Sequence, residues 1–139
     1  MTTTTPAKPP ITCHVLDTTI GRPAANIPVT LTLYPSSSSS STTTTLTFTA
    51  TTNTDGRVTA WTPSTPFSST TLAEAFAQAE GDQRYGLTFD TEAYFGDKGI
   101  ATFFPEVEVK FVVREGAKAE HYHVPVLLGP FGYTTYRGS

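Results

Sequence analysis

Apolar and polar residues alternate with a period of two along several short stretches of this chain, the pattern of half-buried β-strands. In residues 11–17, Ile11, Cys13 and Val15 share one face while His14 lies on the other. Similar stretches occupy residues 27–34, 46–53, 85–90, 107–113 and 121–128. Each is predicted to form a strand that packs one face against a core.

Eleven prolines and ten glycines are spread along the chain and leave no room for long helices, which favours an all-β fold. The Asp55-Gly56 pair is typical of a tight type I′ turn. Residues 58–61 are therefore predicted to return antiparallel to the strand at 46–53, with Arg57 at the tip of this hairpin.

The Gly-Pro-Phe-Gly sequence at residues 129–132 predicts a turn between the strand at 121–128 and the end of the chain. If all four residues form the loop, His123 opposes Gly138; if only the first two do, it opposes Tyr136. Either register brings His123 beside the last four residues.

Two segments have helical signals. Thr71 and Glu74 form a capping box at the start of residues 71–80, and residues 91–98 are predicted to form a short helical crossing that Gly99 ends. With about eight strands, one or two short helices and no internal repeat, the predicted architecture is an all-β, two-sheet sandwich.

The 139 residues are enough for one domain, predicted at 11–139. Residues 1–10 are rich in Thr and Pro and are predicted to be a disordered leader. The Ser/Thr tract at 36–45 is predicted to be a long hairpin loop, with a phosphorylated or glycosylated linker as the alternative.

Charge and hydropathy exclude several classes of function. Nine Lys and Arg against twelve Asp and Glu give a net charge of -3, so a nucleic-acid partner is not expected. No apolar run is long enough to span a membrane and the first residues lack a signal peptide, so a cytoplasmic location is expected. The single cysteine, Cys13, excludes a disulfide within the chain and a thiolate metal cluster.

The final residues Tyr136, Arg137, Gly138 and Ser139, which follow HYHVPVLLGPFGYTT, resemble the signature of the 5-hydroxyisourate hydrolase branch of the transthyretin-like family. The segments ITCHVLDTTIGRPAANIPVTL, TNTDGRV, LTFDTEAYF and FFPEVEVKF are similar to the other characteristic blocks of this family, in the same order. The resemblance covers nearly all of residues 11–139. The departures are the Ser/Thr tract and a longer region at 65–82, both at loop positions.

The resemblance implies a transthyretin-like sandwich in which two copies join by edge strands and the dimers stack into a homotetramer, with active sites between the dimers. It also implies that His14, Arg57 and His123 are catalytic and that residues 136–139 bind substrate, with no metal or other cofactor. Members of the family are often peroxisomal, which is the alternative to a cytoplasmic location.

The implied reaction opens a ring amide of a small oxidised purine by attack of water, on the route from urate toward allantoin. The attack needs a base near neutral pH, which His14 or His123 can supply, and the sequence leaves open which of the two acts. Arg57, with Arg137 as a second donor, can stabilise charge that develops on oxygen. Ser139 can position water or the ring through its hydroxyl or carboxylate.

Three other functions compete with this one. His121, His123 and His14 can be ligands of a hydrolytic zinc ion. A small-ligand carrier with the same fold is a second alternative, although transthyretin itself lacks the YRGS ending and the His/Arg set. A structural sandwich of the adhesion type is the third, and it predicts no convergence of His14, Arg57 and His123.

Overall fold

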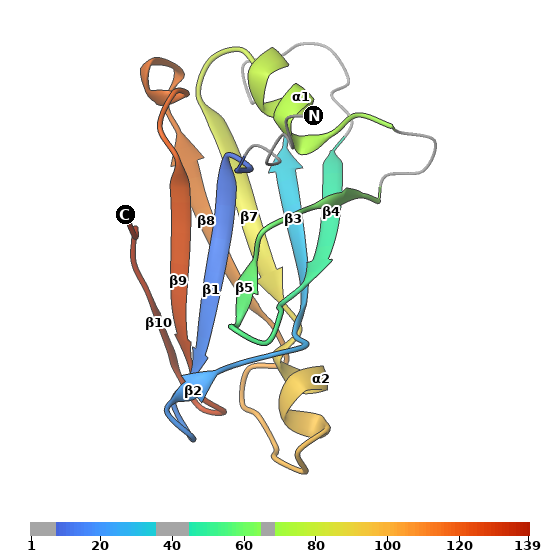
Figure 1. The fold of residues 1–139 in the computed structure, drawn as a ribbon, viewed down its shortest axis with the longest axis vertical. Coiled ribbons are helices and arrows are strands. Elements are labelled where there is room, and N and C mark those ends of the chain that lie inside the picture. Colours follow the sequence, from blue (N-terminus) through green and yellow to red (C-terminus); the bar gives the residue numbers. More distant parts are fainter. Residues whose placement is uncertain (1–7, 36–44, 65–68) are drawn as a thin grey trace, which may run out of the picture.

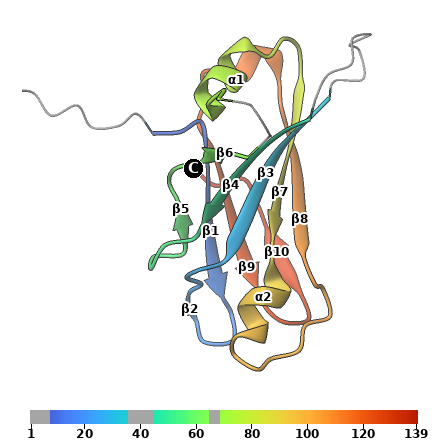
Figure 2. The ribbon, with the colours of Figure 1, turned by 90° about the vertical axis from the view of Figure 1, so that its right-hand side faces the viewer.

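Two β-sheets pack face to face in the computed structural model, which describes residues 8–35, 45–64 and 69–139 (Figure 1). The first sheet has the order β10-β9-β1-β2, with β5 also paired to β1, and the second has the order β6-β4-β3-β7-β8. The predicted two-sheet sandwich is confirmed. The helices α1 and α2 lie at opposite ends of the sandwich (Figure 2).

The elements follow the predicted stretches closely. The strands are β1 (Ile11–Asp17), β2 (Arg22–Pro23), β3 (Pro28–Tyr34), β4 (Leu46–Thr51), β5 (Arg57–Val58), β6 (Thr62–Pro63), β7 (Gln83–Phe89), β8 (Val107–Val113), β9 (Tyr122–Leu128) and β10 (Tyr133–Thr135). The helices are α1 (Leu72–Gln78), α2 (Thr91–Gly96) and the 3-10 turn η1 (Glu115–Ala117). The short strands β2 and β6 were not predicted, because two residues carry no periodic pattern.

Strand alternation separates the core from the outer surface of the first sheet. The inward side chains of β1 and β9, such as Cys13, Val15 and Val126, are buried against Leu31 and Phe48 of the second sheet. The opposite face of the same two strands carries His14 and His123, and His121 immediately precedes β9. One sheet thus supplies half of the core and a chemically reactive outer face.

The central pair of the first sheet joins distant parts of the chain, because β1 runs parallel to β9 with Thr12 opposite His123. On the other side of β9, β10 is antiparallel and Tyr133 lies opposite Leu128. An additional bridge sets His123 opposite Gly138. Of the two predicted registers, the one with a four-residue loop is therefore correct.

The hairpin predicted around Arg57 is wrong in its partner. β5 does not return along β4 but crosses to the first sheet, where Arg57 lies opposite His14, while β6 pairs with β4. The turn is not type I′ either, since that turn needs a positive φ at two residues and here only Gly56 has one, of 73°. A Cβ on Gly56 would lie 2.4 Å from the backbone oxygen of Val15, so glycine permits the close approach of this loop to β1.

The two predicted helices are confirmed, as is the predicted cap Thr71; the cap of α2, Asp90, was not predicted. The backbone N–H of Glu74 donates to Oγ1 of Thr71, and that of Ala93 donates to the Asp90 carboxylate. Among the described residues, no helix has the length and apolar character needed to cross a membrane.

The predicted Ser/Thr loop at 36–45 lies outside the described residues except for its last position. Residues 1–7 of the predicted leader also lie outside them, whereas the Pro10 carbonyl already accepts a hydrogen bond from the backbone N–H of Tyr122. The predicted boundaries of the leader and of the domain stay predictions.

Candidate active site

The outer face of the first sheet brings together the three predicted catalytic residues from three strands. His14 on β1 and Arg57 on β5 are paired across the sheet, and His123 lies on the other side of β1 on β9. The two imidazole rings are 6.5 Å apart between centroids and are tilted by 33°. The convergence that the structural sandwich alternative does not predict is present.

A pocket of about 240 Å³ opens beside these residues. Its walls include Arg57, His123 and Ser139, which were predicted, and Lys8 and Thr12, which were not. Cys13, Val58 and Thr59 complete the lining. The pocket is thus a small site whose lining includes two cationic side chains, three hydroxyl-bearing residues and an imidazole.

Arg57 is held in place by the turn that precedes it. The Asn53 side-chain oxygen accepts hydrogen bonds from the backbone N–H groups of Asp55 and Arg57, at 2.9 and 3.0 Å. The Asn53 N–H also donates to the Arg57 carbonyl. The Arg57 guanidinium makes no ion pair with any residue that the structure describes, so its charge faces the pocket uncompensated.

Burial and nearby positive charge keep the histidines of this face neutral. Burial first, and then the Arg57 guanidinium, lower the pKa of His14, while the backbone and carboxylate of Asp55 oppose this shift. Burial lowers the pKa of His123 as well, and Arg57, His14, His121 and Lys8 add to the effect. A histidine whose pKa lies below its usual value near 6.5 is unprotonated at neutral pH, the state that a general base needs.

Thr12 connects two imidazoles on this face. Its Oγ1 lies 2.8 Å from Nδ1 of His123 and 2.9 Å from Nε2 of His121. Neither Thr12 nor Lys8 was predicted as a site residue from the sequence. The available signal for Thr12 was its position two residues before His14, because residues at that spacing in a strand share a face.

The chain beyond β10 runs along His123 and reaches the pocket. The backbone N–H of Gly138 donates to the His123 carbonyl at 2.8 Å. A Cβ at Gly138 would lie 2.8 Å from the His123 ring and 2.9 Å from the Pro125 side chain. Glycine is therefore needed for this close approach, which brings Ser139 to the pocket wall.

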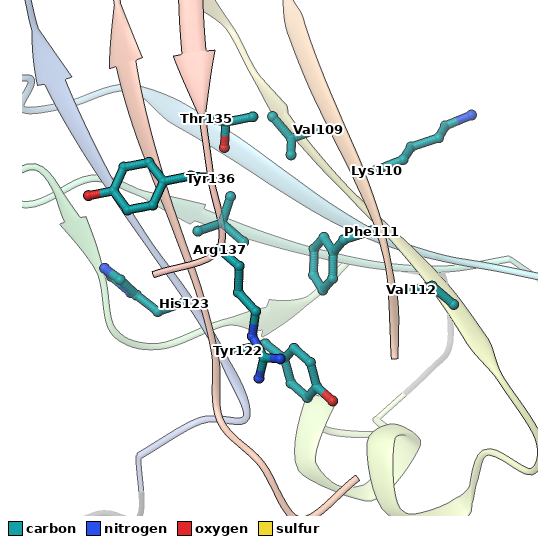
Figure 3. Close-up of a pocket in the computed structure, with 10 residues that line it drawn as sticks. Val109, Lys110, Phe111, Val112, Tyr122, His123, Thr135, Tyr136 and Arg137 are labelled. Carbon is teal, nitrogen blue, oxygen red and sulfur yellow. The ribbon is translucent and has the colours of Figure 1, made fainter. Parts of the chain in front are cut away.

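Arg137 points to the other side of its strand. Its guanidinium binds the Glu120 carboxylate at 3.1 Å and lies over the Tyr122 ring, 4.6 Å from the centroid. Figure 3 shows this side chain running to Tyr122, whereas the exposed Tyr136 lies on the side of His123. Tyr122, Tyr136 and Arg137 line a second pocket, of about 270 Å³, between β8 and the segment after β10. A substrate contact by Arg137 or Tyr136 stays a prediction.

Neither the single cysteine nor the zinc alternative adds a reactive group to this site. Burial raises the pKa of the Cys13 thiol to about 12, so Cys13 is a core residue rather than a nucleophile. Within residues 8–35, 45–64 and 69–139, no three His, Cys, Asp or Glu side chains are grouped so that they could hold a metal ion. The zinc alternative built on His14, His121 and His123 gains no support from this geometry.

Comparison with known proteins finds similarity over nearly the whole chain. A family model described as the HIUase/Transthyretin family matches residues 11–138. A probable 5-hydroxyisourate hydrolase of Schizosaccharomyces pombe is 36% identical over 134 residues, which cover 96% of this chain and 94% of that protein.

Solved structures of both functional branches of this family also match. The 5-hydroxyisourate hydrolase of Klebsiella pneumoniae has a TM-score of 0.62 and 31% identity, covering 93% of this chain and 97% of its own. Sea bream transthyretin in complex with thyroxine has a TM-score of 0.68 and 24% identity, covering 93% and 94%. The similarity to the carrier concerns the fold alone, because its identity is so low.

Proposed function

Because this chain belongs to the HIUase/transthyretin family, we propose that it hydrolyses 5-hydroxyisourate to 2-oxo-4-hydroxy-4-carboxy-5-ureidoimidazoline, in urate degradation toward allantoin. The observation that carries this proposal is the pocket itself. It combines Arg57, which has no ion-pair partner among the described residues, with the His123 imidazole. The His14 ring lies 6.5 Å from that of His123, and burial and positive charge lower the pKa of both rings.

Each group has a part in the attack of water on a ring carbonyl. His14 or His123 takes a proton from water as the oxygen attacks the carbonyl carbon. The Arg57 guanidinium donates hydrogen bonds to the carbonyl oxygen as negative charge develops there. The proton then passes to the ring nitrogen as the C–N bond breaks, which opens the ring and leaves a carboxylate. No metal and no covalent nucleophile is needed.

The C-terminal residues complete the substrate site in this proposal. Gly138 brings the chain against the His123 ring, and the Ser139 hydroxyl can hold water or the flat ring. Lys8 adds a second cation to the pocket and favours a substrate with acidic ring N–H groups. Arg137 is a substrate contact in the proposal only after it leaves Glu120 and Tyr122, whereas the exposed Tyr136 already lies on the side of His123.

A carrier without catalysis is the alternative that the fold alone leaves open. A carrier needs complementary shape and apolar contact, whereas this pocket has Arg57 beside the His123 imidazole, with the His14 ring 6.5 Å from it. Imidazoles are suited to proton transfer. Relatives that are at least 30% identical over most of this chain include two named as 5-hydroxyisourate hydrolases, a uric acid degradation bifunctional protein and an (S)-allantoin synthase. Both considerations favour the enzyme.

We also propose the homotetramer that the family resemblance implies. β8 and β10 are the last strands of their sheets, and their outer edges have no partner strand among the described residues. Two copies can therefore join along these edges, on either side of the pocket between them. Sedimentation velocity tests this assembly, and a monomer at assay concentration would contradict it. The cytoplasmic location stays a prediction from the sequence.

The activity is tested by adding the purified protein to freshly generated 5-hydroxyisourate and following its absorbance. Accelerated decay is the expected result, and it should persist after treatment with EDTA. Decay at the uncatalysed rate, together with saturable binding of the intact compound, would favour the carrier instead. Loss of activity in EDTA that zinc restores would favour the zinc hydrolase.

A further inference from the structure

The hydroxyl of Thr12 lies between two imidazoles, and only a few arrangements of hydrogen bonds allow it to bind both rings. It has one proton to donate, and it lies 2.8 Å from Nδ1 of His123 and 2.9 Å from Nε2 of His121. When both rings are neutral, a hydroxyl that donates to one nitrogen must accept a proton from the other. The direction of this short chain of hydrogen bonds then fixes the tautomer of both rings.

The direction depends on the ring nitrogen of His121 that does not face Thr12. Burial, and then Lys8, lower the pKa of His121, while the backbone of Pro9, as a hydrogen-bond partner of the ring, opposes this shift. Because proline has no N–H, its backbone can only accept, so the ring nitrogen that meets it carries a proton. With Nε2 at Thr12, the protonated nitrogen is Nδ1, and a neutral His121 then presents an unprotonated Nε2 to the Thr12 hydroxyl.

The tautomer of His123 then follows from counting the protons in these hydrogen bonds. Thr12 donates to His121, so its oxygen accepts from Nδ1–H of His123. A neutral His123 protonated at Nδ1 has an unprotonated Nε2. That nitrogen has no protein partner among the described residues, and His123 lines the pocket with Arg57 and Ser139.

We propose that Thr12 and His121 are positioning residues that hold His123 in its Nδ1-protonated tautomer, so that Nε2 faces the pocket as a proton acceptor. The role in hydrolysis rests on the proposed function, whereas the tautomer itself does not. When Nε2 takes a proton from water, the hydroxide oxygen forms the new bond to the carbonyl carbon. The His123 imidazolium keeps its Nδ1–H bond to Thr12, and Nε2 later returns the proton to the leaving ring nitrogen.

In this arrangement His121 helps to position His123, a role that its place in the sequence does not indicate. His121 is partly buried and lies at the start of β9, at the margin of the site. It acts on His123 only through the Thr12 hydroxyl, much as a carboxylate orients a catalytic histidine in other hydrolases. Thr12 is 5% exposed, so the bond is shielded from competing water.

The tautomer can be measured without substrate. A long-range ¹H–¹⁵N spectrum of the labelled protein, recorded above the titration range of its three histidines, distinguishes Nδ1–H from Nε2–H rings. His14→Gln and His121→Gln variants assign the signals. We expect His123 as Nδ1–H in the parent, and a shift toward the Nε2–H form in Thr12→Val, which keeps the shape and removes the hydroxyl. Nε2–H for His123 in the parent would overturn the proposal.

Kinetics of the same variants test the consequence. Thr12→Val is expected to lower kcat by about tenfold to 100-fold, the scale for groups that orient a ligand or catalytic imidazole, with a smaller change in KM. Thr12→Ser should restore most of the rate, and His121→Gln should lower kcat in the same direction. Thr32→Val on β3 of the other sheet is the matched control and should behave like the parent.

The pH profile separates positioning from simple loss of structure. The groups that face His123 are Arg57, His14, His121 and Lys8, and none of them changes in Thr12→Val. Removing the hydroxyl that accepts from the His123 imidazolium should lower the pH at which the acid limb of kcat begins. Parent kcat and an unchanged limb in Thr12→Val would overturn the relay while leaving hydrolysis established. Absence of any hydrolysis would instead refute the proposed function, and the tautomer measurement would still decide the relay.

Discussion

The outer faces of the two sheets are both polar, but they treat their charges differently. On the second sheet, Tyr34 donates a hydrogen bond to Glu108, and Lys110 lies 3.7 Å from Glu108 and 4.8 Å from the centre of the Tyr34 ring. Glu108 and Lys110 therefore pair with each other within this face. On the first sheet, Arg57 has no ion-pair partner among the described residues and lies beside two imidazoles.

This difference identifies the reactive surface better than polarity alone. A charge that the protein itself has paired has little left to offer a ligand, and exposed pairs contribute little stability. A cation left beside neutral imidazoles shifts their pKa and is available to a substrate. The same contrast separates Arg57 from Arg137, which is bound to Glu120 and packed on Tyr122.

The largest expected effect is the loss of kcat when His14, Arg57 or His123 is replaced. His14→Asn, Arg57→Gln and His123→Asn should each lower kcat by at least ~10²-fold, because each removes a positioned proton acceptor or a charge-stabilising donor. Steady-state hydrolysis measures the effect, and circular dichroism checks the fold. Arg84→Gln on β7 is the matched control in the other sheet and should retain the parent rate. A single unaffected variant among the three would remove that residue from the site.

The second expected effect concerns the loop that carries Arg57 to the first sheet. Gly56→Ala adds a Cβ 2.4 Å from the Val15 carbonyl oxygen at a φ of 73°. Gly21→Ala has a similar φ of 63° with no atom within 4 Å, so it isolates the backbone strain of about 1 to 2 kcal/mol. Gly56→Ala should lower the free energy of unfolding by about 1 to 3 kcal/mol more, the usual cost of overpacking. Equal losses in urea denaturation would mean that the loop can move away from β1.

A smaller effect is expected on the titration of the two imidazoles. The positive charge of Arg57 lowers the pKa of both His14 and His123, so Arg57→Gln should raise both pKa values toward the ordinary value near 6.5. In the parent, the catalytically competent neutral forms are therefore lost only at a lower pH than in the variant. NMR titration of the ring protons measures this shift. Unmoved pKa values in Arg57→Gln would show that burial alone keeps the rings neutral.

The smallest effect is expected where the charges are already paired. Glu120→Gln removes the partner of Arg137 from an ion pair whose two side chains are more than half exposed, 57% and 54%. Such a pair contributes about 0 to 1 kcal/mol, so the free energy of unfolding should change little. The hydrolysis rate should stay near that of the parent if Arg137 mainly packs on Tyr122. A clear rise in kcat or fall in KM would instead mean that the freed Arg137 reaches the substrate.

Strand positions were largely predictable because burial of one face imposes a period of two. β1 coincides with the predicted stretch at 11–17, and β8 with the one at 107–113. The helix α1 was predictable for a similar reason, since its cap Thr71 accepts a hydrogen bond from the backbone N–H of Glu74, only three residues away. Local physical chemistry is sufficient in each of these cases.

The partner of a short strand was not predictable in the same way. Arg57 and Val58 follow a turn that points equally well to a hairpin with β4, but β5 instead joins β1. The choice depends on a long-range fit, in which Gly56 comes close enough for its carbonyl to accept from the Val15 N–H at 2.8 Å. Thr12 was missed for the same reason, because its two imidazole partners lie more than a hundred residues away.

By itself, the sequence determined the sandwich class, most strand boundaries, the family and the candidates His14, Arg57 and His123, since alternation, caps and motifs are written in neighbouring residues. Only the tertiary structure decided which sheet receives β5, which way Arg137 turns, and that Thr12 joins His121 to His123. These outcomes depend on contacts between distant segments. Their free energy is a property of the packed sheets, and no local pattern of residues encodes it.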